Sequence, residues 1–198
     1  MKYLTQIHVG RSEAAQRNIC DPYAWHKMIW QAYPEKNRQP RNYLFRIDAG
    51  ASTFRVLLLS IERPTLADWG TWRTKTISAD FLKHQNYRFQ LKANPTMRRN
   101  SDRRRLPIYQ EDRLRLWITR KAECAGFQIL KRSLVVGAPI DESFTRNGKR
   151  GKHVSVDFQG IASVDNRDLF RNAFCCGIGP AKAFGFGMLM LQPIFQTA

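Results

Sequence analysis

A tyrosine and a histidine lie three residues apart near the start of the chain, in the segment DPYAWH at positions 21–26. Asp21 followed by Pro22 is typical of a helix start, because the aspartate caps free backbone N–H groups and proline fits the first helical position. Residues spaced i and i+3 are neighbours on a helix. We therefore expect Tyr23 and His26 to lie together, on a flank beside the apolar stripe that begins at Trp25.

This pair is suited to acid–base chemistry on RNA. An imidazole titrates near neutral pH and can accept or give a proton, and a phenol can orient a hydroxyl or donate to a phosphate oxygen. RNA carries its own nucleophile, the 2′-hydroxyl, so a protein need only align it, move protons and balance charge. The sequence predicts His26 and Tyr23 as catalytic residues that need no metal.

The same spacing also occurs where a tyrosine and a histidine pack at the edge of a core, so the pattern leaves both interpretations open. The other histidines, His8, His84 and His153, are weaker catalytic candidates. His8 lies in a predicted strand, and the other two lie in or beside basic stretches. His153 is a candidate for a further RNA contact.

A glycine-rich segment, GIGPAKAFGFG, occupies positions 177–187 near the end of the chain. Glycine allows a positive φ and close backbone approach to a phosphate, so we predict a phosphate-binding loop. It matches neither a Walker A loop nor a dinucleotide fingerprint, so no nucleotide cofactor is expected. The alternative is a tight turn packed between two sheets. The predicted loop residues are Gly177, Gly179, Gly185 and Gly187, with Lys182 as an RNA contact.

Two further segments are rich in basic residues and are predicted to bind RNA. The first lies between Pro95 and Pro107 and either follows the phosphates of an RNA stem or is a solvated linker. The second is a hairpin tip at 145–152, with Asn147-Gly148 as its turn. In A-form RNA the major groove is deep and narrow, so phosphate and shape contacts should dominate. The residues concerned are Arg98, Arg99, Arg103, Arg104, Arg105, Arg146, Lys149, Arg150 and Lys152.

The overall charge supports a polyanionic partner. The chain has 198 residues, 33 Lys and Arg against 16 Asp and Glu, and a formal net charge of +17. Such an excess favours phosphate binding with counterion release. Arginine outnumbers lysine by 22 to 11, and its planar fork and stacking ability favour nucleic acid over an anionic membrane.

Cysteine spacing and hydropathy bear on metal binding and on the cellular location of the protein. Cys20, Cys124, Cys175 and Cys176 form no Cys-x-x-Cys pair, so we expect free, mostly buried thiols and no zinc site. No apolar run approaches the ~20 residues that span a bilayer, and residues 1–9 lack the apolar block of a signal peptide. A cytoplasmic location is predicted.

The elements that must position these residues alternate between strand and helix. Strands are expected at 3–9, 43–47, 54–60, 87–93, 127–130, 134–136, 153–161 and 187–191, and helices at 22–33, 111–125 and 166–174. This order predicts an α+β fold of two tandem ferredoxin-like domains with antiparallel sheets. The expected division is an N-terminal domain at 1–94, an Arg-rich linker at 95–106 and a C-terminal domain at 107–198.

Several of these segments together resemble a known family. They are the opening strand at 3–9, the Tyr23, His26 and Trp30 helix, the YLFR strand at 43–46, the FQLKANPT segment at 89–96 and the glycine-rich segment at 177–187. The chain resembles the CasE-type CRISPR-associated endoribonucleases of the RAMP superfamily, in a type I-E-like setting.

The resemblance implies metal-independent cleavage of CRISPR repeat RNA at the base of its stem-loop, with no cofactor. His26 matches the family's catalytic histidine and Tyr23 a tyrosine that some members use beside it. Lys149, Arg150 and Lys152 fall in a loop similar to the stem-binding region. Members of the family often keep the cleaved 3′ hairpin as a subunit of a crRNA-guided complex. The alternative is a non-catalytic RNA-hairpin-binding subunit. A third hypothesis, a DNA-binding or ribosomal-type basic protein, is supported by no sequence motif of such proteins.

Overall fold

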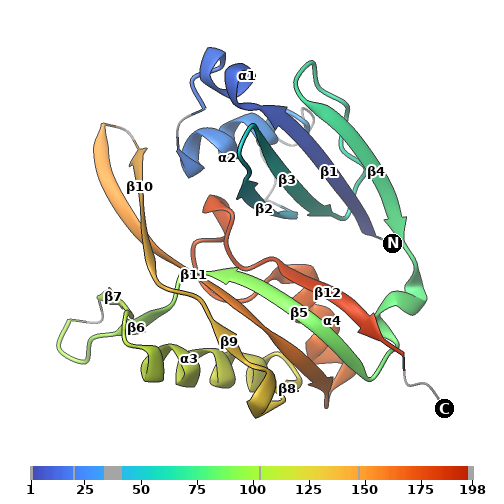
Figure 1. Cartoon of the computed structure of the whole chain (residues 1–198), viewed down its shortest axis with the longest axis vertical. Coiled ribbons are helices and arrows are strands. Elements are labelled where there is room, and N and C mark those ends of the chain that lie inside the picture. Colours follow the sequence, from blue (N-terminus) through green and yellow to red (C-terminus); the bar gives the residue numbers. More distant parts are fainter. Residues whose placement is uncertain (1, 20, 34–41, 103, 147, 196–198) are drawn as a thin grey trace. The chain divides into compact units, whose positions relative to one another are not determined.

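The computed structural model describes residues 2–19, 21–33, 42–102, 104–146 and 148–195. Its first sheet has four antiparallel strands in the order β2-β3-β1-β4, with α1 and α2 on one face (Figure 1). In chain order the elements are β1 (Lys2–Gly10), α1 (Arg11–Gln16), α2 (Pro22–Trp30), β2 (Tyr43–Ala49), β3 (Thr53–Ser60) and β4 (Thr71–Ile77).

Helix α2 follows the expected start and the expected stripe. The Asp21 side chain accepts a hydrogen bond from the Ala24 backbone N–H, and Pro22 occupies the first turn. Trp25, Met28 and Ile29 are all buried and pack with side chains from β1, β2 and β3 in one core. The helix ends at Trp30, three residues earlier than expected.

The second sheet has six strands in the order β10-β11-β5-β12, with β8 and β9 also pairing with β11. The described pairings are antiparallel, and one core joins α3 and α4 to this sheet. The elements are η2 (Ala79–Leu82), β5 (Asn86–Ala93), β6 (Thr96–Arg98), β7 (Arg105–Pro107), α3 (Glu111–Cys124), β8 (Phe127–Ile129), η3 (Lys131–Ser133), β9 (Val135–Val136), β10 (Ile140–Arg146), β11 (Lys149–Val164), α4 (Arg167–Cys176), η4 (Lys182–Phe184) and β12 (Leu189–Ile194).

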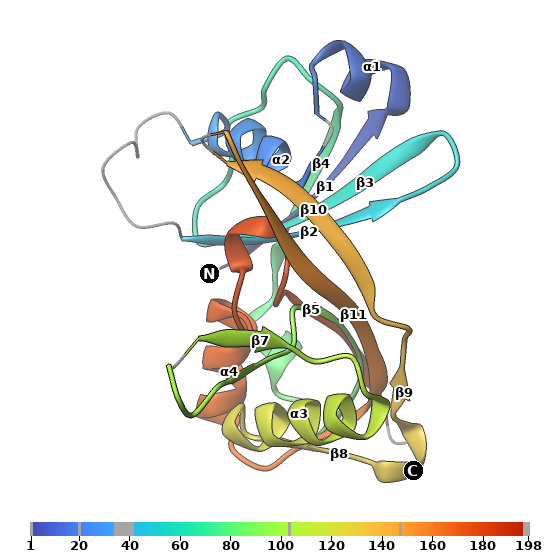
Figure 2. The same cartoon turned by 90° about the vertical axis from the view of Figure 1, so that its left-hand side faces the viewer.

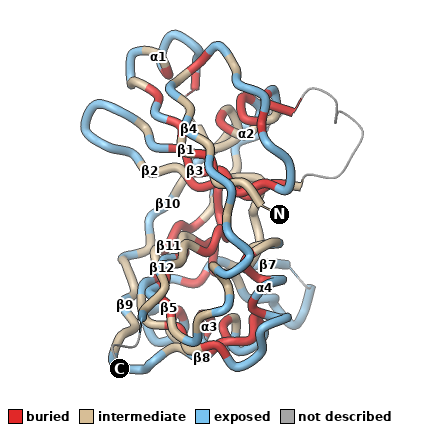
Figure 3. The backbone as a smooth tube through the Cα atoms, turned by 90° about the vertical axis from the view of Figure 1, so that its right-hand side faces the viewer, coloured by how far each residue is buried: buried red, intermediate tan, exposed pale blue. Residues whose placement is uncertain are grey.

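The chain divides into two compact units. The first comprises the chain up to Ser78 with residues 143–151 and 183–185, and the second comprises the remainder. The tip of the β10–β11 hairpin and part of the glycine-rich segment therefore belong with the first sheet. In Figure 3 the buried positions, in red, lie along strands such as β1, β3 and β5 and on parts of the longer helices, whereas β4 has none. The predicted fold class, α+β with two antiparallel sheets, is confirmed.

The division of the chain differs from the expected 1–94, 95–106 and 107–198. Strand β5 pairs with β11 and β12, so it belongs to the second sheet. Residues 95–106 are no linker, because β6 and β7 form an antiparallel hairpin there inside the second unit. Alternation identifies a strand but cannot say which sheet it joins.

Helix α1 and strands β4 and β10 were not expected from the sequence. Helix α1 has only six residues, and β4 and β10 are polar segments, TWRTKTI and IDESFTR. Such strands lack the apolar alternation that sequence patterns depend on.

The described cysteines are free thiols, as expected, but they are not mostly buried. Cys124 and Cys176 are exposed and Cys175 is intermediate, because they lie in the last turns of α3 and α4. Cys20 lies outside the described residues. Across the described ranges, every helix is too short or too polar to cross a bilayer.

Candidate functional site

The first turn of α2 is attached to the tip of the β10–β11 hairpin by one carboxylate. Asp21 Oδ1 accepts a hydrogen bond from the Ala24 backbone N–H at 2.8 Å, and Asp21 Oδ2 accepts one from the Thr145 backbone N–H at 2.9 Å. All three residues belong to the first unit, and Figure 2 shows the orange hairpin tip beside α2. The Ala24 amide is therefore already engaged, and this first-turn donor does not face a ligand.

Tyr23 and His26 lie side by side, as the helical spacing predicts. Their ring centroids are 6.4 Å apart, and both side chains are partly buried. The His26 ring also contacts Trp30, at 5.9 Å between centroids, and stacks on Phe45 of β2 at 6.4 Å and 16°. The Lys27 ammonium lies 5.3 Å from the centre of the Tyr23 ring. A phenol, an imidazole and a cation thus share one surface of α2.

Two phenylalanines extend this aromatic group. Phe184, in η4, lies 6.3 Å from the Tyr23 ring and 4.5 Å from the ring of Phe144 in the hairpin. Across the hairpin, a Cβ built on Gly151 would lie 2.4 Å from Phe144 Cζ, so only glycine leaves room for that ring. The sequence pattern did not predict a role for Phe144, Phe184 or Phe45. Phe184 stands directly before Gly185 in the glycine-rich segment, and that neighbour was the signal that could have pointed to it.

The glycine-rich segment owes its glycines partly to packing. Gly177, Gly179, Gly185 and Gly187 have φ values of 77°, 84°, 85° and 86°, where side chains are strained. The Gly187 N–H donates to the Lys92 carbonyl at 2.8 Å, and its carbonyl accepts from the Ile178 N–H at 2.9 Å.

Gly185 lies in the first unit, where an added Cβ would come within 3.1 Å of Phe45 Cε2. Lys182 is partly buried in η4. The described geometry thus fits the tight-turn alternative at Gly187 and a close approach to the aromatic group at Gly185.

The cations of the basic hairpin differ in whether a carboxylate already pairs with them. Lys149 and Arg150 are exposed at the start of β11, after Gly148 with its φ of 72°. Lys152 instead pairs with Asp141, with 2.7 Å between Nζ and Oδ2. The side chain of Arg146, and Asn147 as a whole, lie outside the described residues.

The second predicted RNA-binding cluster is the β6–β7 hairpin of the second unit. Arg98 and Arg105 are exposed and lie directly opposite each other, an arrangement in which like charges repel. Arg99 and Arg104 approach Asp102, at 3.7 and 3.4 Å. Arg103 lies outside the described residues. This cluster belongs to the second unit, and the Tyr23–His26 pair belongs to the first.

The remaining histidines have other surroundings. His8 is exposed on β1, and His84 packs edge-on against Phe195. His153 Nδ1 lies 2.8 Å from Asn94 Nδ2; burial lowers the pKa of His153, and the negative charge of Glu142 opposes that effect. Glu142 pairs with Lys92 at 2.7 Å.

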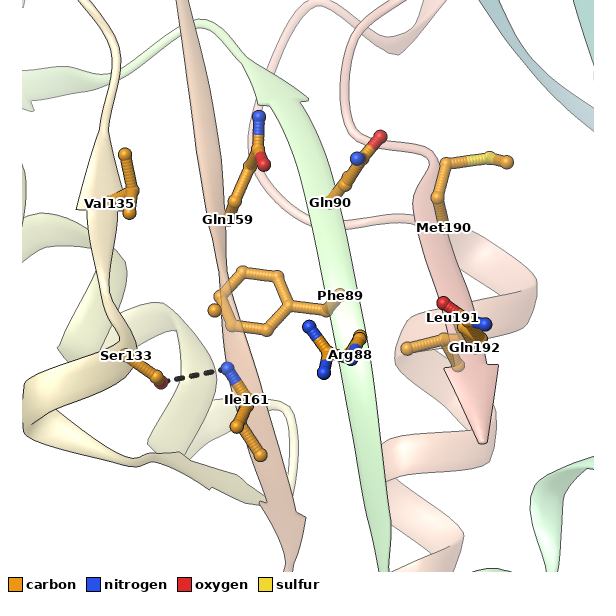
Figure 4. Close-up of a pocket in the computed structure, with 11 residues that line it drawn as sticks. Arg88, Phe89, Gln90, Ser133, Val135, Gln159, Ile161, Met190, Leu191 and Gln192 are labelled. Carbon is orange, nitrogen blue, oxygen red and sulfur yellow. Dashed lines mark hydrogen bonds between the residues drawn. The ribbon is translucent and has the colours of Figure 1, made fainter. Parts of the chain in front are cut away.

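A depression crosses the outward side of the second sheet (Figure 4). Gln159 of β11 pairs in register with Gln90 of β5, which in turn pairs with Met190 of β12. At its edge Ser133 Oγ accepts a hydrogen bond from the Ile161 N–H at 2.8 Å. None of the residues predicted to bind or cut RNA lines it. Among the described side chains, no three His, Cys, Asp or Glu residues are grouped so as to hold a metal ion.

Comparisons with known proteins agree with this architecture. A family model described as CRISPR associated protein matches residues 2–193. The CRISPR system Cascade subunit CasE of Escherichia coli K12 is 26% identical, over 97% of this chain and 100% of that protein. The CRISPR-associated endoribonuclease Cse3 of Thermus thermophilus is 24% identical, over 96% of this chain and 100% of that protein.

A solved structure of CRISPR endoribonuclease Cse3 bound to a 19-nucleotide RNA superimposes with a TM-score of 0.85 at 23% identity, covering 96% of this chain and 100% of that one. This likeness shows the fold, two tandem ferredoxin-like domains. The chain therefore belongs to the CRISPR-associated protein family, in its CasE/Cse3 branch.

Proposed function

We propose that the protein is an endoribonuclease that cuts CRISPR repeat RNA at the base of its stem-loop. The observation that carries this proposal is the Tyr23–His26 pair at the start of α2, with ring centroids 6.4 Å apart. The names of the two relatives, one a Cascade subunit and the other an endoribonuclease, support the same activity. After cleavage the protein keeps the 3′ hairpin and serves as a subunit of an RNA-guided complex.

In the proposed reaction the RNA supplies the nucleophile. The 2′-oxygen forms a bond to phosphorus while its proton is removed, and the bond from phosphorus to the 5′-oxygen breaks as that oxygen gains a proton. The products are a 2′,3′-cyclic phosphate and a 5′-hydroxyl. The imidazole of His26 shuttles the proton: it accepts the proton that leaves the 2′-hydroxyl, and a proton passes from it to the departing 5′-oxygen. The phenol of Tyr23 orients the 2′-hydroxyl or donates to a phosphate oxygen, and no cofactor takes part.

The nearby hairpin supplies the binding charge. Lys149 and Arg150 are exposed in the same unit as His26, where they can neutralise phosphates of the stem. Lys27, beside the Tyr23 ring, adds positive charge close to where charge develops on the phosphorane. The Arg98–Arg105 cluster is a second phosphate-binding surface in this proposal.

The experiment incubates the protein with its cognate repeat RNA in EDTA, beside the same RNA with a 2′-deoxy sugar at the cut position. We expect cleavage in EDTA, a cyclic phosphate end on the upstream product and no cleavage of the deoxy RNA. Cleavage that requires Mg²⁺, or that proceeds on the deoxy RNA, would overturn the mechanism.

The packing of His26 favours a second candidate function. Its ring contacts Trp30 and stacks on Phe45, which also suits a structural histidine in a non-catalytic RNA-hairpin-binding subunit. Tight binding of the repeat hairpin with no cleavage under any ionic condition would support that alternative.

A further inference from the structure

One carboxylate joins the helix that carries Tyr23 and His26 to a hairpin residue 124 positions later in the chain. We propose that Asp21 is a positioning residue, which couples RNA binding at the basic hairpin to the placement of the Tyr23–His26 pair. This inference rests on the proposed endoribonuclease function and adds a role for a residue that touches neither the RNA nor the reacting atoms.

The two oxygens of Asp21 have separate partners. Oδ1 caps the helix at the Ala24 N–H, at 2.8 Å, and Oδ2 accepts from the Thr145 N–H, at 2.9 Å. Thr145 lies four residues before Lys149 and five before Arg150, in the same hairpin. Lys149 and Arg150 begin β11, and Thr145 lies on the neighbouring strand β10. A phosphate held by those cations therefore fixes a hairpin whose other strand is hydrogen-bonded to the start of α2.

Helix capping alone does not explain a carboxylate at this position. Serine caps helices about as well as aspartate, and a negative charge close to a phosphate-binding hairpin opposes binding of a polyanion. Beyond serine, aspartate offers a negative charge, which is favourable at the positive end of the helix dipole, and a second acceptor, which reaches the Thr145 amide. Only the second acceptor connects the helix start to the hairpin.

A second set of contacts connects the same two elements through Phe184 of η4. Phe144, next to Thr145, packs on Phe184 with centroids 4.5 Å apart, and Phe184 lies 6.3 Å from the Tyr23 ring. The Phe144 ring occupies the space that a Cβ on Gly151 would fill, at 2.4 Å. The hairpin thus reaches α2 directly, through the hydrogen bond at Asp21, and indirectly, through Phe184 of η4, which lies between Phe144 and Tyr23.

The test compares variants that keep the cap and lose the link. Asp21→Ser retains a cap oxygen but is too short to hold Thr145, and Asp21→Asn can accept from only one of the two amides. The matched control is Asn166→Ser, at the N-cap of α4, where Asn166 Oδ1 accepts from the Asp168 and Leu169 N–H groups without a hairpin link. Single-turnover cleavage of repeat RNA is measured at saturating protein, with binding of the 2′-deoxy RNA measured separately.

We expect both Asp21 variants to cut on the order of 10- to 100-fold more slowly, because small misplacement of catalytic groups costs that much. Binding of the deoxy RNA should stay within about twofold or tighten slightly, since a negative charge is removed. The Thr145 amide should exchange its hydrogen faster in both variants, and Asn166→Ser should match the parent in rate. Wild-type cleavage rates for Asp21→Ser, or a slower rate that a change of pH restores, would overturn the coupling.

An independent variant addresses the aromatic contact. Gly151→Ala should displace Phe144 and slow cleavage in the same way, while Lys149 and Arg150 keep their charges and the salt dependence of binding is unchanged. Equal loss of binding and cleavage would overturn a positioning role. A parent protein that binds the hairpin but never cuts it would instead contradict the proposed function, so the two failures are distinguishable.

Discussion

The imidazole of His26 stacks on the ring of Phe45, with their centroids 6.4 Å apart and their planes 16° from parallel. Phe45 is fully buried in β2, so the position of the histidine ring depends on a residue of the core. Aromatic contacts of this kind have preferred geometries. The packing of the first sheet and the orientation of the proposed catalytic group are therefore linked.

Replacing His26 with alanine should slow cleavage by on the order of 10²–10⁴, the usual contribution of general acid–base catalysis. Binding of uncleavable RNA should barely change, because the imidazole is not the main phosphate contact. Single-turnover rates and filter binding measure the two effects. His8→Ala, an exposed histidine on β1, is the control and should cut normally. Parallel losses of binding and cleavage in His26→Ala would argue for a structural histidine.

Gly185→Ala should impair both stability and cleavage. Its φ of 85° makes a side chain cost about 1–2 kcal/mol, and the new Cβ would press on Phe45 at 3.1 Å. Gly148→Ala is the comparison, because it has a φ of 72° but nothing within 4 Å of the added Cβ.

Thermal unfolding should therefore show a larger loss for Gly185→Ala than for Gly148→Ala, and a further drop in single-turnover rate should accompany it. Equal losses of stability in the two variants would mean that Phe45 does not resist the added carbon.

Neutralising Lys149 and Arg150 to glutamine should weaken RNA binding and flatten its salt dependence. For every phosphate that the protein no longer neutralises, the slope of log affinity against log salt should fall by about 0.7–0.9. Lys152→Gln should have a smaller effect, because Asp141 already pairs with that ammonium at 2.7 Å. Binding titrations at several salt concentrations decide this, and an unchanged slope for Lys149 and Arg150 would remove the hairpin from the interface.

Asp48 should make the first unit sensitive to acid. Burial raises the pKa of its carboxyl, but hydrogen bonds and positive charge from Arg55 and Arg46 together outweigh burial and hold the pKa below its ordinary value. A lowered folded-state pKa contributes stability above the unfolded-state pKa, and that stability is lost as the pH falls through the folded-state value.

Asp48→Asn should therefore cost about 1–2 kcal/mol in urea unfolding at pH 7, and the difference should shrink as the pH approaches 3. The exposed Asp80, paired with Lys83, serves as the control, and Asp80→Asn should change little at either pH. A difference for Asp48→Asn that stays constant with pH would contradict this account.

Local sequence determined much of this protein. Asp21 and Pro22 set the start of α2, and the apolar spacing from Trp25 to Ile29 chose its buried side, which left Tyr23 and His26 together on its flank. These features depend only on residues within a turn or two of one another. The charge excess, a property of composition alone, likewise favoured a nucleic-acid partner.

Tertiary structure decided what depends on distant partners. The hydrogen bond from Thr145 to Asp21 and the contact of Phe144 with Phe184 join residues that no local pattern relates. The alternating pattern of β5 would be the same whichever sheet the strand joined. Its pairing with β11 and β12 places it in the second unit. Register and pairing depend on which buried surfaces fit together in three dimensions. Phe45 of β2 comes to lie against His26 in this way, so the folded chain, and no local pattern, decides what surrounds the histidine.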